Sequence, residues 1–100
     1  MNDPLIHSTW SDGDMRDLLE LFVSELPQKI AECRNALDAQ DWERLRTTAH
    51  RLKGAAGSYG FPLISQAALI LETSARERKP SATIQEHMLA LTQLCERARA

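Results

Sequence analysis

The fold is decided by residues 41–60, which read DWERLRTTAHRLKGAAGSYG. Apolar residues recur here at alternating steps of three and four; they are Trp42, Leu45, Ala49, Leu52, Ala56 and Tyr59. This spacing places one apolar seam along a helix, which is typical of a helix packed in a bundle. Asp41 precedes the seam as a capping residue, and Gly60-Phe61-Pro62 interrupts it. We therefore predict a helix between Asp41 and Tyr59.

The sequence on either side predicts further helices of similar length. Apolar residues recur at helical spacing over about 11–26, 27–40, 62–79 and 81–98, and no segment alternates as a strand would. Short connections between such helices make neighbours antiparallel. The predicted fold is all-α, an antiparallel up-down four-helix bundle with an additional N-terminal helix. One domain spans residues 1–100, of which about the first ten are irregular.

Some helix boundaries have more than one interpretation. Ser11, with Asp14 three residues later, predicts the start of the first helix. Pro27 either starts a second helix or kinks a continuous one, because proline is tolerated in a first turn but disrupts a helix interior. The last helix begins at Ser81 or at Thr83, which could form a capping box with Glu86.

Composition narrows the function classes. The formal net charge of −2 argues against a nucleic-acid binder, which usually has a basic excess. No apolar run is long enough to cross a bilayer, and residues 1–4 do not resemble a signal peptide. Cys33 and Cys95 are isolated and fall on apolar stripes, so we predict buried thiols rather than a disulfide or a metal site. We expect a cytoplasmic protein with no nucleic-acid or membrane partner.

His50 lies away from the apolar seam. Each residue of an ideal helix turns roughly 100°, which places His50 about 130° from the centre of the seam, facing outward. Gly54 and Gly57 fall on the same face, one and two turns further on. A glycine inside a helix costs about 1 kcal/mol relative to alanine, so two of them beside an exposed histidine require an explanation.

Access to the imidazole is one explanation. A helical side chain leans towards the N-terminus, so a side chain at position 54 would cover the ring of His50. Lys53 leans back towards the same spot, and Arg46 adds positive charge one turn earlier. A neutral imidazole is a good nucleophile near pH 7, and Lys53 could neutralise a phosphoryl group bound to it. The pattern predicts an exposed nucleophile for phosphoryl transfer.

The alternative is a rim histidine beside glycines that let two helices pack closely, and the residues alone leave both interpretations open. The sequence contains no acidic cluster for Mg²⁺, no P-loop and no glycine-rich nucleotide loop. Under the first interpretation, another protein therefore supplies the metal and the phosphoryl donor.

Residues 50–60, HRLKGAAGSYG, resemble the histidine phosphotransfer (HPt) domain family through its pattern H-x-L-K-G and a further glycine downstream. The helix plan agrees with that family over nearly the whole chain. The resemblance implies a four-helix bundle whose exposed histidine receives phosphate from a receiver-domain aspartate and returns it to another receiver. It implies His50 as phospho-acceptor, Lys53 as phosphoryl stabiliser and Gly54 as the small residue that permits docking.

The resemblance also implies a polar residue on the next helix that hydrogen-bonds and orients the imidazole. By position this residue is Glu72, with Arg76 one turn later. Glu72 either orients His50 or forms an ordinary surface ion pair with Arg76. The predicted docking residues are Arg46, Gly54, Gly57, Leu69 and Arg76.

The leading hypothesis is a monomeric phosphocarrier of a two-component phosphorelay. Its partners are response-regulator receiver domains or a hybrid sensor histidine kinase. It has no cofactor and no ATP site, because the partner receiver supplies Mg²⁺ and the phosphoryl group. Two alternatives stay open: the phospho-accepting module of a larger histidine kinase, and a non-catalytic helical adaptor bundle.

Overall fold

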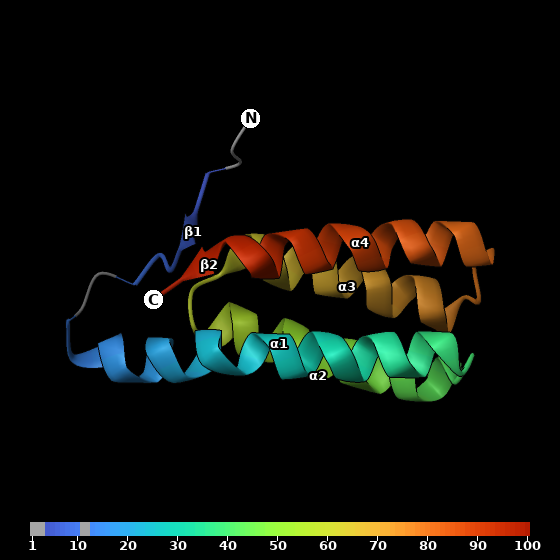
Figure 1. Ribbon diagram of the computed structural model, residues 1–100, viewed down its shortest axis with the longest axis horizontal. Helices are drawn as coiled ribbons and strands as arrows, with labels where there is room; N and C mark the ends of the chain where they lie inside the picture. The colour runs from blue at the N-terminus through green and yellow to red at the C-terminus, as the bar shows by residue number, and fades with distance from the viewer. Residues whose placement is uncertain (1–3, 11–12) are drawn as a thin grey trace.

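The computed structural model describes residues 4–10 and 13–100, without the side chain of Asp14. Within these ranges four α-helices lie side by side along the long axis of the molecule (Figure 1). They are α1 (Arg16–Asp38), α2 (Trp42–Ser58), α3 (Pro62–Arg76) and α4 (Ser81–Arg97). Each helix contacts the next along the chain, and α4 also contacts α1, so the four enclose one core. The all-helical prediction is confirmed.

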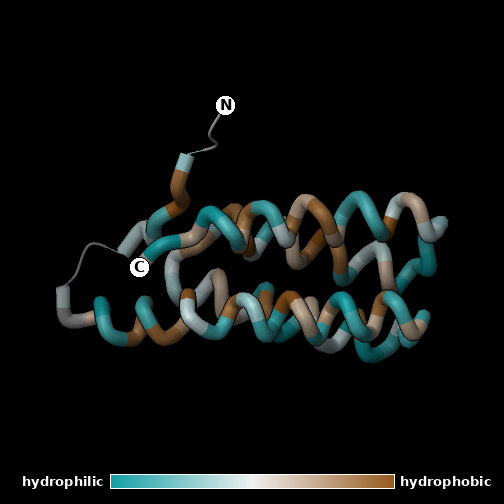
Figure 2. Tube along the Cα trace, viewed as in Figure 1, coloured by the Kyte–Doolittle hydropathy of each residue, from teal (hydrophilic) through white to brown (hydrophobic). Residues whose placement is uncertain are grey.

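Each helix buries one stripe of apolar side chains and exposes the rest. Polar and apolar residues consequently interleave along all four helices in Figure 2. The side chains buried most completely are Leu26, Cys33, Leu45, Phe61, Ile64, Leu71, Ile84, Met88 and Leu91.

Both cysteines are buried and unpaired, as predicted. Burial raises the pKa of Cys33 to about 11 and that of Cys95 to about 12, so both thiols stay protonated at neutral pH.

The additional N-terminal helix predicted before Pro27 is wrong as a separate element. Helix α1 runs without interruption from Arg16 to Asp38, with Pro27 inside it. Pro27 has no N–H to donate, which costs about 3 kcal/mol or more within a helix. The cost is offset because the apolar stripes on both sides of Pro27 lie on one face and are buried together, as Leu26 and Cys33 illustrate. Pro27 itself is exposed, where water can reach the carbonyl that it leaves unpaired.

The structure confirms the predicted cap of one helix and decides between the two predicted starts of the last helix. The Asp41 side chain accepts a hydrogen bond from the Arg44 N–H at 3.1 Å, which confirms it as the cap of α2. Helix α4 begins at Ser81, so Thr83 lies inside it and the capping-box alternative is wrong. The predicted cap at Ser11 lies outside the described residues. Before α1 there is a short 3-10 helix, η1 (Gly13–Met15).

A short strand pair was not predicted. Strand β1 (Ile6–His7) pairs in parallel with β2 (Ala98–Arg99), beside one end of the bundle (Figure 1). Two residues are too few for an alternating pattern, and the partners come from opposite ends of the sequence. None of the helices in the described part of the chain is long and apolar enough to cross a membrane.

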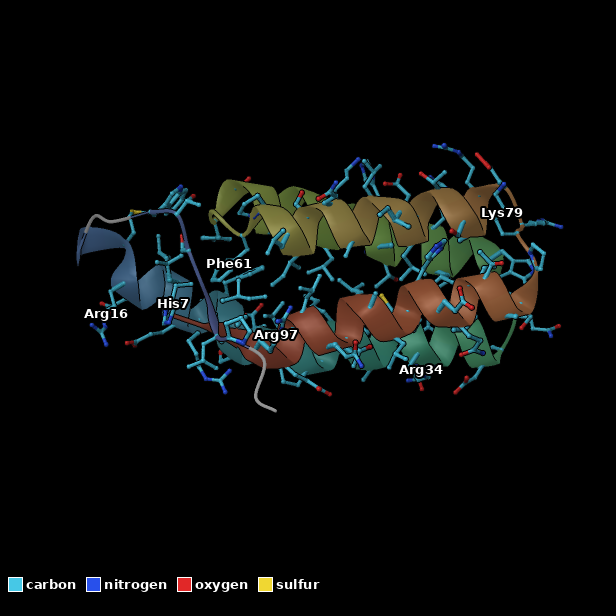
Figure 3. The ribbon with its side chains drawn as sticks, turned by 90° about the horizontal axis from the view of Figure 1, so that it is seen from above. His7, Arg16, Arg34, Phe61, Lys79 and Arg97 are labelled. Atoms are coloured by element: carbon cyan, nitrogen blue, oxygen red, sulfur yellow. The ribbon has the colours of Figure 1, made fainter. Side chains whose placement is uncertain are left out.

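Residues 8–10, which precede the first helix, contact the connection between α2 and α3 and hold it in place. Ser8 Oγ donates to the Tyr59 carbonyl at 2.6 Å, and the Thr9 N–H donates to the Gly60 carbonyl at 2.7 Å. The rings of Trp10 and Phe22 lie 5.8 and 5.1 Å from that of Tyr59. Figure 3 shows Phe61 at this end of the bundle and Lys79 at the other end. The entry of the chain into α3 is therefore held from both sides.

Gly60 is the tightest point of this connection. Its φ is 79°, and a Cβ there would lie 2.5 Å from Ser8 Oγ and 2.9 Å from Thr9 Oγ1. We predict that Gly60→Ala lowers the free energy of unfolding by more than about 1 kcal/mol, because alanine disfavours this backbone conformation. Urea denaturation measures this effect. Gly13→Ala is the matched control, since none of the residues that the structure describes lies within 4 Å of its added Cβ, and it should change stability by less than about 0.5 kcal/mol. Equal effects of the two substitutions would contradict the account.

Candidate functional site

His50 lies on the outer flank of α2, where that helix meets α3. Its sequence neighbours Ala49 and Leu52 are buried, whereas the His50 side chain is 58% exposed. The helical spacing predicts this outward position, and the structure agrees. The imidazole is therefore open to solvent on one side and contacts the protein on the other.

Glu72 of α3 provides that contact. Its Oε2 lies 2.9 Å from Nδ1 of His50, and its side chain is only 7% exposed. Glu72 is held there because α3 packs closely on α2, with Ala68, Leu71 and Ala75 in the core. Of the two interpretations of Glu72, the contact with His50 is the one observed. An ion pair with Arg76 is not what engages this carboxylate.

Lys53 approaches the same carboxylate from α2. Its Nζ lies 3.3 Å from Glu72 Oε1, and its side chain is partly buried. Among the described residues no donor is aligned well enough with Oε1 for a hydrogen bond. Lys53 is thus paired with Oε1 through charge, whereas Oε2 lies within hydrogen-bond distance of the ring.

The ionisation of Glu72 determines which ring nitrogen is free. Burial is the largest influence and opposes ionisation, but the contacts with His50 and Lys53 outweigh it, so the pKa of Glu72 is below its ordinary value. An ionised carboxylate can only accept hydrogen bonds. The proton between the two groups therefore belongs to Nδ1 of His50, and in the neutral ring Nε2 carries the free lone pair.

The two glycines near His50 differ in their surroundings. Apart from the chain neighbours and the nearby backbone of α2 itself, no atom of the described residues lies within 4 Å of a Cβ built on Gly54, so this position is open. A Cβ on Gly57 would contact Ser65 Oγ of α3 at 3.4 Å. Ser65 Oγ in turn donates to the Lys53 carbonyl at 2.9 Å, which joins the two helices. Gly57 therefore faces α3 at ordinary contact distance, whereas no described residue of another element packs against position 54.

The other predicted docking residues lie on the same flank. Leu69 is 44% exposed, one turn before Glu72 on α3. Arg46 forms an ion pair with Glu43, and Arg76 is exposed. Sequence reasoning missed that the two arginines line one cavity of about 160 Å³. Its lining residues are Trp42, Glu43, Arg46, Ala75, Arg76 and Arg78. Arg78 belongs to the α3–α4 connection, so helical spacing could not place it there.

The family model that matches this chain is the Hpt domain, over residues 17–100. The chain belongs to the Hpt domain family. Hpt domains are phosphotransfer modules that work with receiver domains in phosphorelays. A comparison with curated proteins gives no match.

A solved structure shares the fold of this Hpt domain. It is the crystal structure of the HPT domain from a sensor hybrid histidine kinase of Shewanella. The similarity has a TM-score of 0.61 at 23% sequence identity and covers 80% of this chain and 72% of the other. At this identity the likeness supports the helical arrangement alone.

The lowered pKa of Glu72 predicts an acid-sensitive contribution to stability. A glutamate in an unfolded chain has a pKa of about 4.3. Ionised Glu72 therefore stabilises the native state at neutral pH, and this contribution disappears as the pH falls through the lower native pKa. We expect the free energies of unfolding of the native chain and Glu72→Gln to differ most at neutral pH and to converge in acid.

Urea denaturation between about pH 7 and pH 3 measures this difference. Glu20→Gln is the control, because Glu20 is an exposed partner of Arg16 and its effect should be small at every pH. A difference between the native chain and Glu72→Gln that stays constant over the whole range would contradict the assignment.

Proposed function

We propose that this Hpt domain is a phosphocarrier that accepts a phosphoryl group on Nε2 of His50 from a receiver-domain aspartate and passes it to another receiver. The observation that carries the proposal is the pairing of His50 Nδ1 with the buried carboxylate of Glu72 at 2.9 Å. This pairing directs the lone pair of Nε2 away from the protein, on a side chain that is 58% exposed. A partner can reach it there.

The transfer is a displacement at phosphorus. The Nε2 lone pair attacks the phosphorus of the aspartyl phosphate, the N–P bond forms, and the P–O bond breaks with its electron pair returning to the aspartate carboxylate. Nδ1 keeps its proton, so the ring becomes positively charged beside Glu72. Lys53 neutralises the phosphoryl oxygens once it leaves the carboxylate. Mg²⁺ held by the receiver supplies further charge neutralisation, and the chain needs no cofactor of its own.

The flank around His50 is suited to docking. Gly54 leaves the ring uncovered, Leu69 offers an apolar contact, and the cavity between Arg46, Arg76 and Arg78 is basic. Basic groups at the rim of an interface steer an acidic partner surface and fix its orientation. We propose that this flank of α2 and α3 contacts the receiver.

The proposal extends to the whole chain. Residues 1–100 act as one monomeric domain, in which the short connections make consecutive helices alternate in direction as an up-down bundle. The reaction takes place in the cytoplasm, where the unpaired thiols of Cys33 and Cys95 stay reduced.

Transfer from a phosphorylated receiver tests the function. We expect the chain to acquire an acid-labile label when it is mixed with a phosphorylated receiver and Mg²⁺, and His50→Gln to acquire none. His7→Gln is the matched control, since His7 is an exposed histidine on β1, and it should be labelled like the native chain. A panel of receivers that leaves the native chain unlabelled, or labels His50→Gln equally, would overturn the proposal.

Enlarging Gly54 tests the docking surface. We expect Gly54→Leu to fold normally, because the position is open and leucine favours helix more than glycine does. Its transfer rate should fall at least about tenfold, since the new side chain lies across the ring of His50. The control is Ala90→Leu on the exposed face of α4, which should leave the rate unchanged. Stopped-flow or gel-based kinetics with one receiver measures both. Normal transfer by a folded Gly54→Leu would rule out this surface.

A further inference from the structure

We propose that Glu72 is a positioning residue that makes phosphorylated His50 a ready phosphoryl donor, by holding a proton on Nδ1 after Nε2 has been phosphorylated. This inference rests on the proposed function and deepens it. It concerns how easily the group leaves again, whereas the function itself requires only that His50 accept it.

Release of the phosphoryl group depends on the charge of the group that leaves. When an acceptor carboxylate attacks the phosphorus, the N–P bond breaks and its electron pair returns to Nε2. If Nδ1 carries a proton, the group that departs is a neutral imidazole. If Nδ1 has lost its proton, the departing group is an imidazolate anion, which is a much poorer leaving group. The proton on Nδ1 therefore controls the release of the phosphoryl group.

Glu72 is placed to retain that proton. Its Oε2 lies 2.9 Å from Nδ1, and the side chain is 7% exposed, so water screens the interaction little. A phosphorylated ring that keeps its Nδ1 proton bears a positive charge, which the adjacent carboxylate stabilises. A neutral amide at position 72 could accept the same hydrogen bond and keep the ring oriented, but it would not stabilise the charge.

The other charged groups around Glu72 also affect a positive charge on the phosphorylated ring. Lys53 and Arg46 face it from α2, and Arg76 lies one turn further along α3. All three are cations and oppose a positive charge on the ring. His87 of α4 lies elsewhere, with its Nδ1 2.5 Å from Ser74 Oγ. Among these groups only Glu72 favours the protonated phosphorylated ring. When Lys53 turns to the phosphoryl oxygens, the carboxylate is left to the ring alone.

The experiment compares the whole chain with Glu72→Gln after both are phosphorylated with phosphoramidate, a small donor that needs no partner protein. Loss of phosphohistidine is followed by ³¹P NMR from about pH 5 to pH 9, and transfer to a receiver is measured at pH 8. Glu86→Gln is the matched control, because Glu86 is an exposed glutamate on α4, outside the proposed docking surface, and does not contact His50. Glu72→Asp keeps the charge and serves as the conservative variant.

We expect phosphohistidine in the native chain to remain labile to higher pH than in Glu72→Gln, with the half-maximal rate shifted by roughly one pH unit. Transfer from Glu72→Gln at pH 8 should be roughly tenfold slower, with Glu86→Gln unchanged and Glu72→Asp closer to the native chain. If Glu72→Gln does not fold, the native chain is compared with free N-acetyl-phosphohistidine, and its profile should lie at higher pH.

Identical profiles for the native chain and Glu72→Gln, or for the native chain and the free phosphoamino acid, would overturn this inference while leaving the proposed function intact. A phosphorylated native chain that transfers to no receiver would instead overturn the proposed function.

Discussion

The contact between His50 Nδ1 and the buried carboxylate of Glu72 is the interaction on which the account of this molecule depends. It joins α2 to α3, orients an exposed ring and fixes where the ring proton lies. A carboxylate with so little exposure would be costly to bury without partners, and His50 and Lys53 supply them. The site is therefore also part of the interface between α2 and α3, and its geometry depends on how these two helices pack.

The rest of the fold maintains the relation between those two helices. Leu45 and Leu52 of α2 and Leu71 of α3 are buried in the common core. The three-residue connection between the helices turns at Gly60, and residues 8–10 hold it in place from outside. Position 54, in contrast, is open, since none of the described residues of the other elements packs against it. Rigid support below the ring and free space above it suit the carrier function proposed here.

Much of this arrangement follows from the sequence because it is local. The periodic seam of residues 42–59 predicts α2, and the same helical geometry predicts that His50 faces outward with Lys53 and Gly54 beside it. Features that depend on partners distant in the sequence were not predictable. The choice of Glu72 between His50 and Arg76 depends on how α3 sits against α2, and the position of Arg78 depends on a connection with no periodic pattern. At Pro27 the sequence is misleading in a different way. Proline favours a break in the helix, but the burial of apolar side chains along α1 outweighs this local preference.

The most direct measurement is a ¹⁵N NMR spectrum of the histidine-labelled chain, recorded at a pH where the His50 ring is neutral. The account predicts that Nδ1 of His50 carries the proton and that Nε2 has the chemical shift of an unprotonated nitrogen. It further predicts that phosphorylation adds a ³¹P coupling to Nε2. A spectrum in which Nε2 carries the proton and Nδ1 is bare would contradict the assignment of nucleophile and positioning carboxylate alike.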